Sequence, residues 1–163
     1  ESITKKQYFN MIDLKTGHML GLSAQLGGIL SNLNIDSQIK LREYGKLIGR
    51  AFQIQDDIFE VTSNAKIMGK SLESDFLLGK KTYLMIETKK RFPKEYGEIL
   101  ERRKKNNFES LNLYKELLIN KGIVEECQEY VNATFVKADE VIDDVIPGEI
   151  MKKFTKMLRT RKY

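Results

Sequence analysis

Three acidic side chains lie within one short and otherwise apolar stretch of sequence, between Phe52 and Glu60. Asp56 and Glu60 are four residues apart, so on a helix their carboxylates lie on one face, one turn from each other. Asp57 adds a third carboxylate, and Gln53 precedes Asp56 by one turn on the same side. Neighbouring carboxylates repel each other, more strongly when buried, and a divalent cation relieves that repulsion. Oxygen ligands without cysteine or histidine favour Mg²⁺, which readily bridges carboxylates to phosphate oxygens.

A second acidic cluster in the same chain provides an internal control for this interpretation. Its members are Asp139, Glu140, Asp143 and Asp144, and they too are flanked by apolar residues. Acidic pairs on amphipathic helices are therefore tolerated in this chain without any metal. A solvated acidic edge thus stands as the alternative interpretation of the first cluster.

Lysines and glycines accompany the first acidic cluster but not the second. Downstream of it come Gly69-Lys70, Asp75 and Gly79-Lys80-Lys81-Thr82, a pattern typical of a polar loop that ends at a helix start. Upstream of it, Lys15-Thr16-Gly17 leads into a glycine-rich stretch without formal charge. Lysines beside a carboxylate-bound metal supply the positive charge that a departing diphosphate requires. These surroundings favour a metal-assisted diphosphate site.

Helices must position these residues, because the apolar residues of the chain recur with a helical period. The sequence contains no period-2 strand, internal repeat or low-complexity linker. Residues 16–35 are predicted to form a buried central helix with an apolar stripe (Leu22, Leu26, Ile29, Leu33) and a small-residue face (Gly17, Gly21, Ala24, Gly28). Further helices are expected over 36–61, with Asp36 as its N-cap, and over 80–92, 95–105, 111–121, 124–146 and 149–159. The predicted architecture is all-α, antiparallel and compact.

The composition limits the other classes of protein. A chain of 163 residues with 41% apolar and 31% charged residues is neither a disordered tail nor a membrane bundle, and its length suits one domain. The single cysteine, Cys127, excludes an intramolecular disulfide framework and a multi-cysteine zinc site. The single histidine, His18, excludes Ser-His, Cys-His and poly-His metal chemistry unless that residue alone serves. Cys127 shares an apolar face with Val131 and Phe135, which predicts a core thiol.

The net charge of +5 does not by itself indicate a nucleic-acid partner. The basic runs Lys89-Lys90-Arg91 and Arg102-Arg103-Lys104-Lys105 have no interleaved aromatic residues that could stack on bases. We therefore interpret them as solvated helix faces and expect no nucleic-acid partner.

From about Tyr8 to Thr82 the chain resembles the C-terminal half of a trans-isoprenyl diphosphate synthase. This is the polyprenyl synthetase family of farnesyl, geranylgeranyl and longer polyprenyl diphosphate synthases. The resemblance rests on motifs in the family's order and spacing: Lys15-Thr16-Gly17, Phe52-Gln53-x-x-Asp56-Asp57-x-x-Glu60, Gly69-Lys70, Asp75 and Gly79-Lys80-Lys81-Thr82. It implies an all-α, isoprenoid-synthase-type antiparallel helix bundle. Residues 1–163 would form the C-terminal half of a single polyprenyl synthetase domain, without the first aspartate-rich motif.

The resemblance implies a Mg²⁺-dependent prenyltransferase of isoprenoid biosynthesis. Such enzymes condense isopentenyl diphosphate with an allylic diphosphate to make a longer prenyl diphosphate, using three Mg²⁺ ions per active site. Asp56, Asp57 and Glu60 match the second of the two acidic motifs that hold these ions. The family usually has aspartate where this chain has Glu60, so we expect altered geometry there rather than lost binding.

The resemblance also assigns roles to further residues that act in catalysis. Lys15, Lys70 and Lys80 match lysines that contact the allylic diphosphate. Thr16 and Gln53 match groups whose oxygens face the nascent carbocation. Neutral dipoles suit that position, because the cation would alkylate a nucleophile. A catalytic Ser, Cys or His constellation is then not needed.

The family's first acidic motif lies upstream of where Glu1 begins, so the 163-residue chain alone is expected to be inactive. The full-length parent is expected to be a cytoplasmic homodimer without an integral membrane segment. An alternative is a non-catalytic, prenyltransferase-like subunit that binds a catalytic partner. A basic helical nucleic-acid binder is the least favoured interpretation, because it leaves the acidic helix unexplained.

Overall fold

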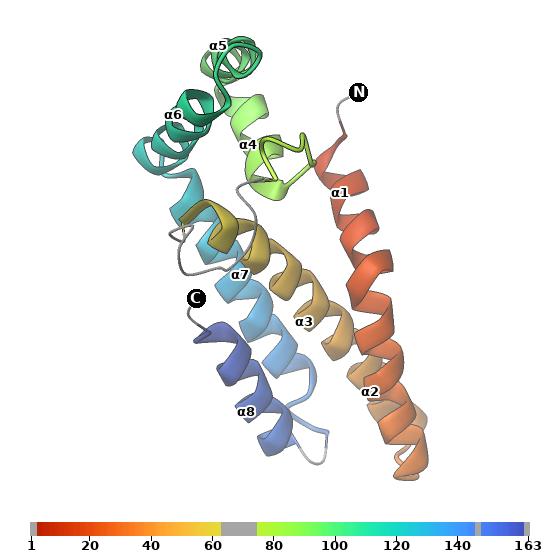
Figure 1. Cartoon of the computed structure of the whole chain (residues 1–163). Helices are drawn as coiled ribbons and strands as arrows, with labels where there is room; N and C mark the ends of the chain where they lie inside the picture. The colour runs from red at the N-terminus through yellow and green to blue at the C-terminus, as the bar shows by residue number, and fades with distance from the viewer. Residues whose placement is uncertain (1–2, 63–74, 146–147, 162–163) are drawn as a thin grey trace. The chain divides into compact units, whose positions relative to one another are not determined.

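The computed structural model describes residues 3–62, 75–145 and 148–161. Helices dominate these residues, and no strand is present among them, which confirms the all-α prediction (Figure 1). Eight α-helices and one π-helical turn follow each other in the described chain: α1 (Lys5–Ile12), the π-helix η1 (Asp13–Gly17), α2 (His18–Leu30), α3 (Ile35–Thr62), α4 (Tyr83–Arg91), α5 (Pro93–Arg103), α6 (Asn107–Asn120), α7 (Ile123–Val141) and α8 (Gly148–Arg159).

The contacts of the chain group into two compact units. The first unit comprises residues 1–8, 54–129 and 163, and the second comprises residues 9–53 and 130–162. The start of α1, the last turns of α3, helices α4 to α6 and the start of α7 therefore belong to the first unit. The second unit contains η1, α2, most of α3, the end of α7 and α8.

In the second unit, α2 runs beside the first half of α3 on a contact made of glycines (Figure 1). A Cβ atom added to Gly49 would lie 2.7 Å from the Cα of Gly17, and one added to Gly45 would lie 2.5 Å from the carbonyl oxygen of Leu20. Such distances leave no room for a side chain, so the two backbones are in direct contact. The predicted small-residue face is thus the face that packs.

The apolar stripe predicted to bury α2 does not do so. Leu22, Leu26 and Ile29 are 43%, 47% and 44% exposed, whereas Gly21 and Gly28 are buried. The prediction of a buried central helix over residues 16–35 was therefore wrong for the described structure. The reason is geometric: because the glycine face lies against α3, the leucines on the other side of α2 point outward.

Helix α8 joins the second unit through buried and charged contacts. The Tyr44 hydroxyl donates to the Met151 carbonyl oxygen at 3.0 Å and lies 3.0 Å from the Thr155 hydroxyl. Two acids of the second acidic cluster are paired with lysines, Asp143 with Lys152 and Asp144 with Lys40. These two members form a salt-bridged surface, as the solvated interpretation expects.

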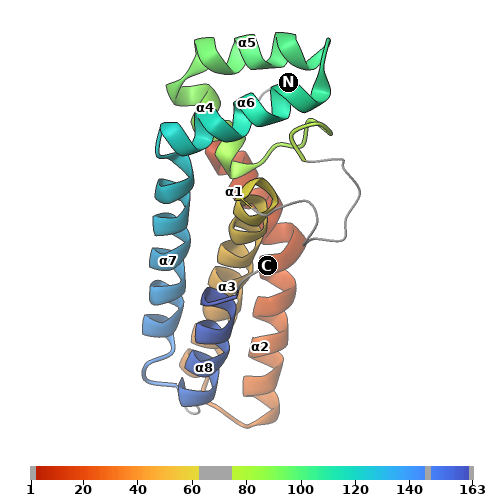
Figure 2. The same cartoon turned by 60° about the vertical axis from the view of Figure 1, so that its left-hand side comes forward.

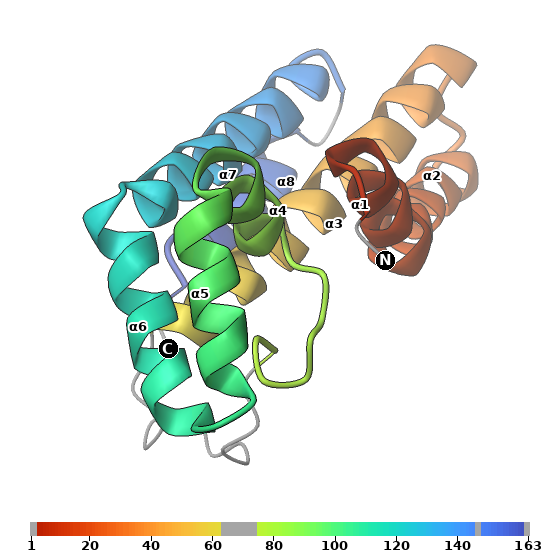
Figure 3. The ribbon, with the colours of Figure 1, turned by 90° about the horizontal axis from the view of Figure 1, so that it is seen from above.

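The first unit is built on the adjacent helices α5 and α6, which lie side by side in Figures 2 and 3. Its interior contains Leu84, Tyr114 and Leu118, all nearly or fully inaccessible to solvent. The ring of Phe76 stacks on that of Tyr114 with centroids 4.4 Å apart. This contact anchors the segment that leads into α4 against α6.

Helix ends follow local capping chemistry, with some differences from the sequence-based bounds. The α3 helix begins at Ile35, and its cap is Asn34, whose side chain accepts from the Ser37 backbone N–H at 2.8 Å. Asp36 instead lies in the first turn, so its prediction as N-cap was wrong. Thr82 caps α4 by accepting from the Met85 backbone N–H.

The α7 helix ends at Val141, before the predicted Ile146, because its last residues form turns. None of the described helices is both long enough and apolar enough to cross a bilayer.

Candidate active site

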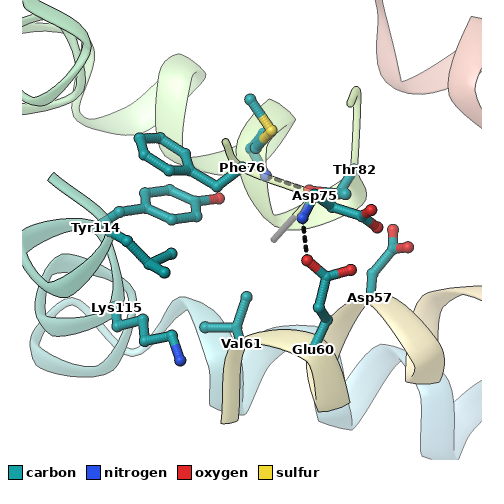
Figure 4. Close-up of a pocket in the computed structure, with 10 residues that line it drawn as sticks. Asp57, Glu60, Val61, Asp75, Phe76, Thr82, Tyr114 and Lys115 are labelled. Atoms are coloured by element: carbon teal, nitrogen blue, oxygen red, sulfur yellow. Dashed lines mark hydrogen bonds between the residues drawn. The ribbon is translucent and has the colours of Figure 1, made fainter. Parts of the chain in front are cut away.

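The carboxyl groups of Asp57 and Glu60 rise from the last turns of α3 toward the segment that carries Asp75 (Figure 4). They line a small pocket in the first unit, with room for about one water molecule (about 10 Å³). The pocket walls come from α3, from the segment before α4, from the start of α4 and from α6. The lining residues are Asp57, Glu60, Val61, Asp75, Phe76, Thr82, Met85, Leu111, Tyr114 and Lys115.

Asp57 is held by two donors that act on the same oxygen. The Tyr8 hydroxyl donates to Asp57 Oδ2 at 2.7 Å, and the Tyr83 backbone N–H donates to it at 3.3 Å. Tyr83 is the first residue of α4, so the carboxylate also lies at the positive end of that helix. Burial nevertheless raises the pKa of Asp57 to about 6, because the loss of water outweighs the two hydrogen bonds.

Tyr8 itself is 1% exposed. Burial, together with the negative charge of Asp57, raises the pKa of its hydroxyl far above the ordinary value for tyrosine. The hydroxyl therefore keeps its proton and acts as a donor to Asp57.

Glu60 and Asp75 are two acidic residues of the pocket that contact each other. The Asp75 backbone N–H donates to Glu60 Oε1, a contact drawn in Figure 4. Burial, and then the adjoining Asp75 carboxyl, raise the pKa of Glu60 to about 7. Lys80 forms an ion pair with Asp75 and partly offsets the negative charge. Asp75 in turn raises the pKa of Lys80, so that lysine is a permanent cation beside the two acids.

The Lys15-Thr16-Gly17 motif lies in the second unit, on the π-helical turn η1. Arg50 of α3 donates to both carboxylate oxygens of Asp13, the first residue of that turn. The contact between Gly17 and Gly49 fixes the other end of the turn against α3. Lys15 is exposed, and Thr16 is half-buried. Single π-helical turns inside α-helices are frequent at functional sites.

The structure brings some of the predicted site residues together and not others. Asp57 and Glu60 line one pocket together with Asp75, and Lys80 pairs with Asp75. Asp56 is on the same helix turn and partly exposed, but it does not line the pocket. Lys15, Thr16 and Gln53 belong to the second unit. Lys70, with Gly69, lies outside the described residues.

Tyr8, Tyr83 and Asp75 contact the acidic residues but were not predicted as site residues. Asp75 carried a signal, because it stands between two Gly-Lys pairs after the acidic helix. Tyr8 is 49 residues from Asp57 in the chain, and Tyr83 acts through its backbone. Neither contact has a signature in the spacing of residues.

The donor set is compatible with Mg²⁺ in one mode of binding. In the described part of the chain no group of three or more His, Cys, Asp or Glu residues is arranged to hold a metal ion. Mg²⁺ commonly binds through one or two carboxylates and takes its other ligands from water and substrate phosphates. Asp57 and Glu60 supply such carboxylates, and the raised pKa of Glu60 indicates a site where a cation can replace a proton.

Comparison with known proteins gives a consistent result. A family profile described as polyprenyl synthetase matches residues 1–119. The geranylgeranyl diphosphate synthase of Saccharolobus solfataricus is 44% identical over 86 residues, which is 53% of this chain and 26% of that protein. The short chain isoprenyl diphosphate synthase of Methanocaldococcus jannaschii is 39% identical over 87 residues, 53% of this chain and 27% of that protein.

Solved structures of similar fold cover the chain almost entirely. A heptaprenyl diphosphate synthase from Staphylococcus aureus superposes with a TM-score of 0.88 at 24% identity, over 99% of this chain and 52% of that one. A geranylgeranyl pyrophosphate synthetase from Pyrococcus horikoshii gives a TM-score of 0.80 at 26% identity, over 99% of this chain and 50% of that one. The chain thus spans about half the length of the solved proteins, and its matches span about a quarter of the curated relatives.

Proposed function

Because the chain belongs to the polyprenyl synthetase family, we propose that its full-length parent is a Mg²⁺-dependent prenyltransferase that joins isopentenyl diphosphate to an allylic diphosphate. Residues 1–163 then form the C-terminal half of its single catalytic domain and carry the second acidic motif. The observation that supports this most directly is the acidic pocket: two partly buried carboxyl groups with raised pKa values, those of Asp57 and Glu60, lie beside Asp75 and the cationic Lys80.

In this proposal the acidic residues bind the metal ions and the lysines contact the diphosphate. Asp56, Asp57 and Glu60 hold Mg²⁺, which neutralises and orients the leaving diphosphate. Lys80 is 59% exposed, so its ammonium group can reach a phosphate oxygen while Asp75 keeps it near the acids. Lys15 and Lys70 are proposed to contact the same diphosphate.

The allylic carbon needs a different environment from the diphosphate. We assign Thr16 and Gln53 to that task, because their neutral oxygens stabilise positive charge without adding to it. The half-buried state of both side chains is compatible with such a role. The arrangement requires no ionisable nucleophile.

A test uses the full-length protein with isopentenyl diphosphate, an allylic diphosphate and Mg²⁺. Chain-elongated product is expected from the wild type, and Asp56→Ala should reduce kcat/KM roughly 10²-fold or more. Asp143→Ala is the matched control, because Asp143 is an acid of the second cluster paired with Lys152 at the surface. No elongated product from the wild type, or full activity of Asp56→Ala, would contradict the proposal.

A non-catalytic subunit is the second candidate, and one observation favours keeping it. The described residues alone assemble no group of three acidic or other metal-binding side chains, so a metal ion at this site would take its remaining ligands from water, substrate phosphates or other residues. A scaffold of this kind would give no product alone but would co-purify with a catalytic chain.

We also propose that the parent is a cytoplasmic homodimer, as the family resemblance implied, and that the isolated 163-residue chain is inactive. Gel filtration tests the dimer, and the same assay tests the inactivity.

A further inference from the structure

The contact between Tyr8 and Asp57 joins the first helix of the chain to the acidic motif. Tyr8 is on α1, and its hydroxyl lies 2.7 Å from Asp57 Oδ2. The terminal torsion of an aspartate side chain is soft, so nothing in the residue itself fixes which oxygen faces the pocket. Two donors on a single oxygen remove that freedom. Oδ2 is the oxygen that accepts from both the Tyr8 hydroxyl and the Tyr83 N–H.

The Tyr8 ring is itself held in place by contacts with α4. It stacks on the Tyr83 ring with centroids 6.0 Å apart and an interplanar angle of 29°. Lys5, one turn earlier on α1, donates to the Tyr83 hydroxyl at 2.5 Å and pairs with Glu87 at 3.3 Å. Lys5 and Tyr8 of α1 therefore both contact the first turns of α4. This makes the tyrosine hydroxyl a rigid donor rather than a mobile one.

We propose that Tyr8 is a positioning residue that orients the Asp57 carboxylate for metal binding. This inference rests on the proposed function, since it takes Asp57 as part of the metal-binding motif. Partners that hydrogen-bond a ligating carboxylate orient it, and their loss typically costs about 10- to 100-fold in metal affinity. Tyr8 precedes the Lys15-Thr16-Gly17 motif in the sequence and belongs to neither acidic cluster of the chain.

The experiment measures Mn²⁺ binding to the purified full-length protein, with free Mn²⁺ quantified by electron paramagnetic resonance. Tyr8→Phe removes one hydroxyl and keeps the stacked ring. Tyr44→Phe is the matched control, because Tyr44 is also buried and hydrogen-bonded through its hydroxyl, but to Met151 and Thr155 of the second unit. Tyr8→Phe should weaken Mn²⁺ binding about tenfold, and Tyr44→Phe should leave it unchanged. Circular dichroism melts of both variants report any general loss of folding.

A double-mutant cycle with Asp57→Asn separates positioning from general stability. If Tyr8 acts through Asp57, Tyr8→Phe should have no further effect on Mn²⁺ affinity once Asp57 is replaced. Additive losses, or equal losses in Tyr8→Phe and Tyr44→Phe, would overturn the inference. If Asp57→Asn weakens binding and Tyr8→Phe does not, the inference fails while the metal assignment stands. If Asp57→Asn also binds Mn²⁺ like the wild type, the metal assignment and the inference fail together.

Discussion

The backbone N–H of Asp75 donates a hydrogen bond to Glu60 Oε1, although the two residues are 15 positions apart in the chain. The contact brings the carboxyl groups of Glu60 and Asp75 to the wall of one small pocket. Lys80 pairs with Asp75 and completes the cluster. Each of these contacts has a consequence that can be measured.

The acidic pocket should make the metal-free protein less stable as the pH rises. Asp57 and Glu60 have pKa values of about 6 and about 7 in the folded chain, against ordinary values of 3.8 and 4.5. Between the ordinary and the raised pKa of each group, the folded state binds more protons than the unfolded state. The free energy of unfolding therefore falls as the pH increases. Urea titrations in EDTA at about pH 5 and about pH 7.5 measure the change. Glu60→Gln should flatten the profile by about 1 kcal/mol or more, and an unchanged profile would show that Glu60 does not titrate in this window.

Lys80 and Lys81 are neighbours with different expected roles. Lys80 pairs with Asp75, which lines the acidic pocket, whereas Lys81 is an exposed lysine. Lys80→Met should weaken binding of inorganic diphosphate with Mg²⁺ by about tenfold, because one charge-assisted hydrogen bond is lost. Isothermal titration calorimetry measures this, with Lys81→Met as the control. Equal effects of the two substitutions would argue for a diffuse charge effect rather than a specific contact.

The glycine contact between α2 and α3 should not tolerate a methyl group. Gly45→Ala would bring a Cβ within 2.5 Å of backbone atoms of Leu20, so we expect a loss of about 2–3 kcal/mol in unfolding free energy. Gly27→Ala is the matched control on the same pair of helices, since its Cβ would meet nothing within 4 Å. That substitution should stabilise the protein by about 0.5–1 kcal/mol through helix propensity. Chemical denaturation of both variants tests the contrast.

Cys127 should be unreactive in the folded protein. The thiol is 1% exposed, as the predicted core position requires, and burial raises its pKa to about 12. Ellman's reagent should therefore label the native chain only as fast as the chain opens, and should label it at once in denaturant. Rapid labelling under native conditions would show that the start of α7 opens far more often than its burial indicates.

The sequence by itself determined the helical class and the composition of the acidic motif. Periodic apolar residues specify helices wherever they occur, and residues at i and i+4 share a face on any helix, so Asp56 and Glu60 could be placed on one side in advance. The cap of α4 at Thr82 is also a local contact, although the sequence-based prediction began this helix at residue 80. All of these features are decided within a few turns of the chain.

Tertiary structure alone decided which helix faces are buried and what surrounds the acids. The leucines of α2 are exposed because its glycines lie against Gly45 and Gly49 of α3, a choice between two plausible faces that a single helix cannot make. Tyr8 and Asp75 reach the acidic motif only because the chain folds back over 49 and 15 residues. The raised pKa values of Asp57 and Glu60 likewise come mainly from burial, which depends on every element packed around them and not on the residues beside them in sequence.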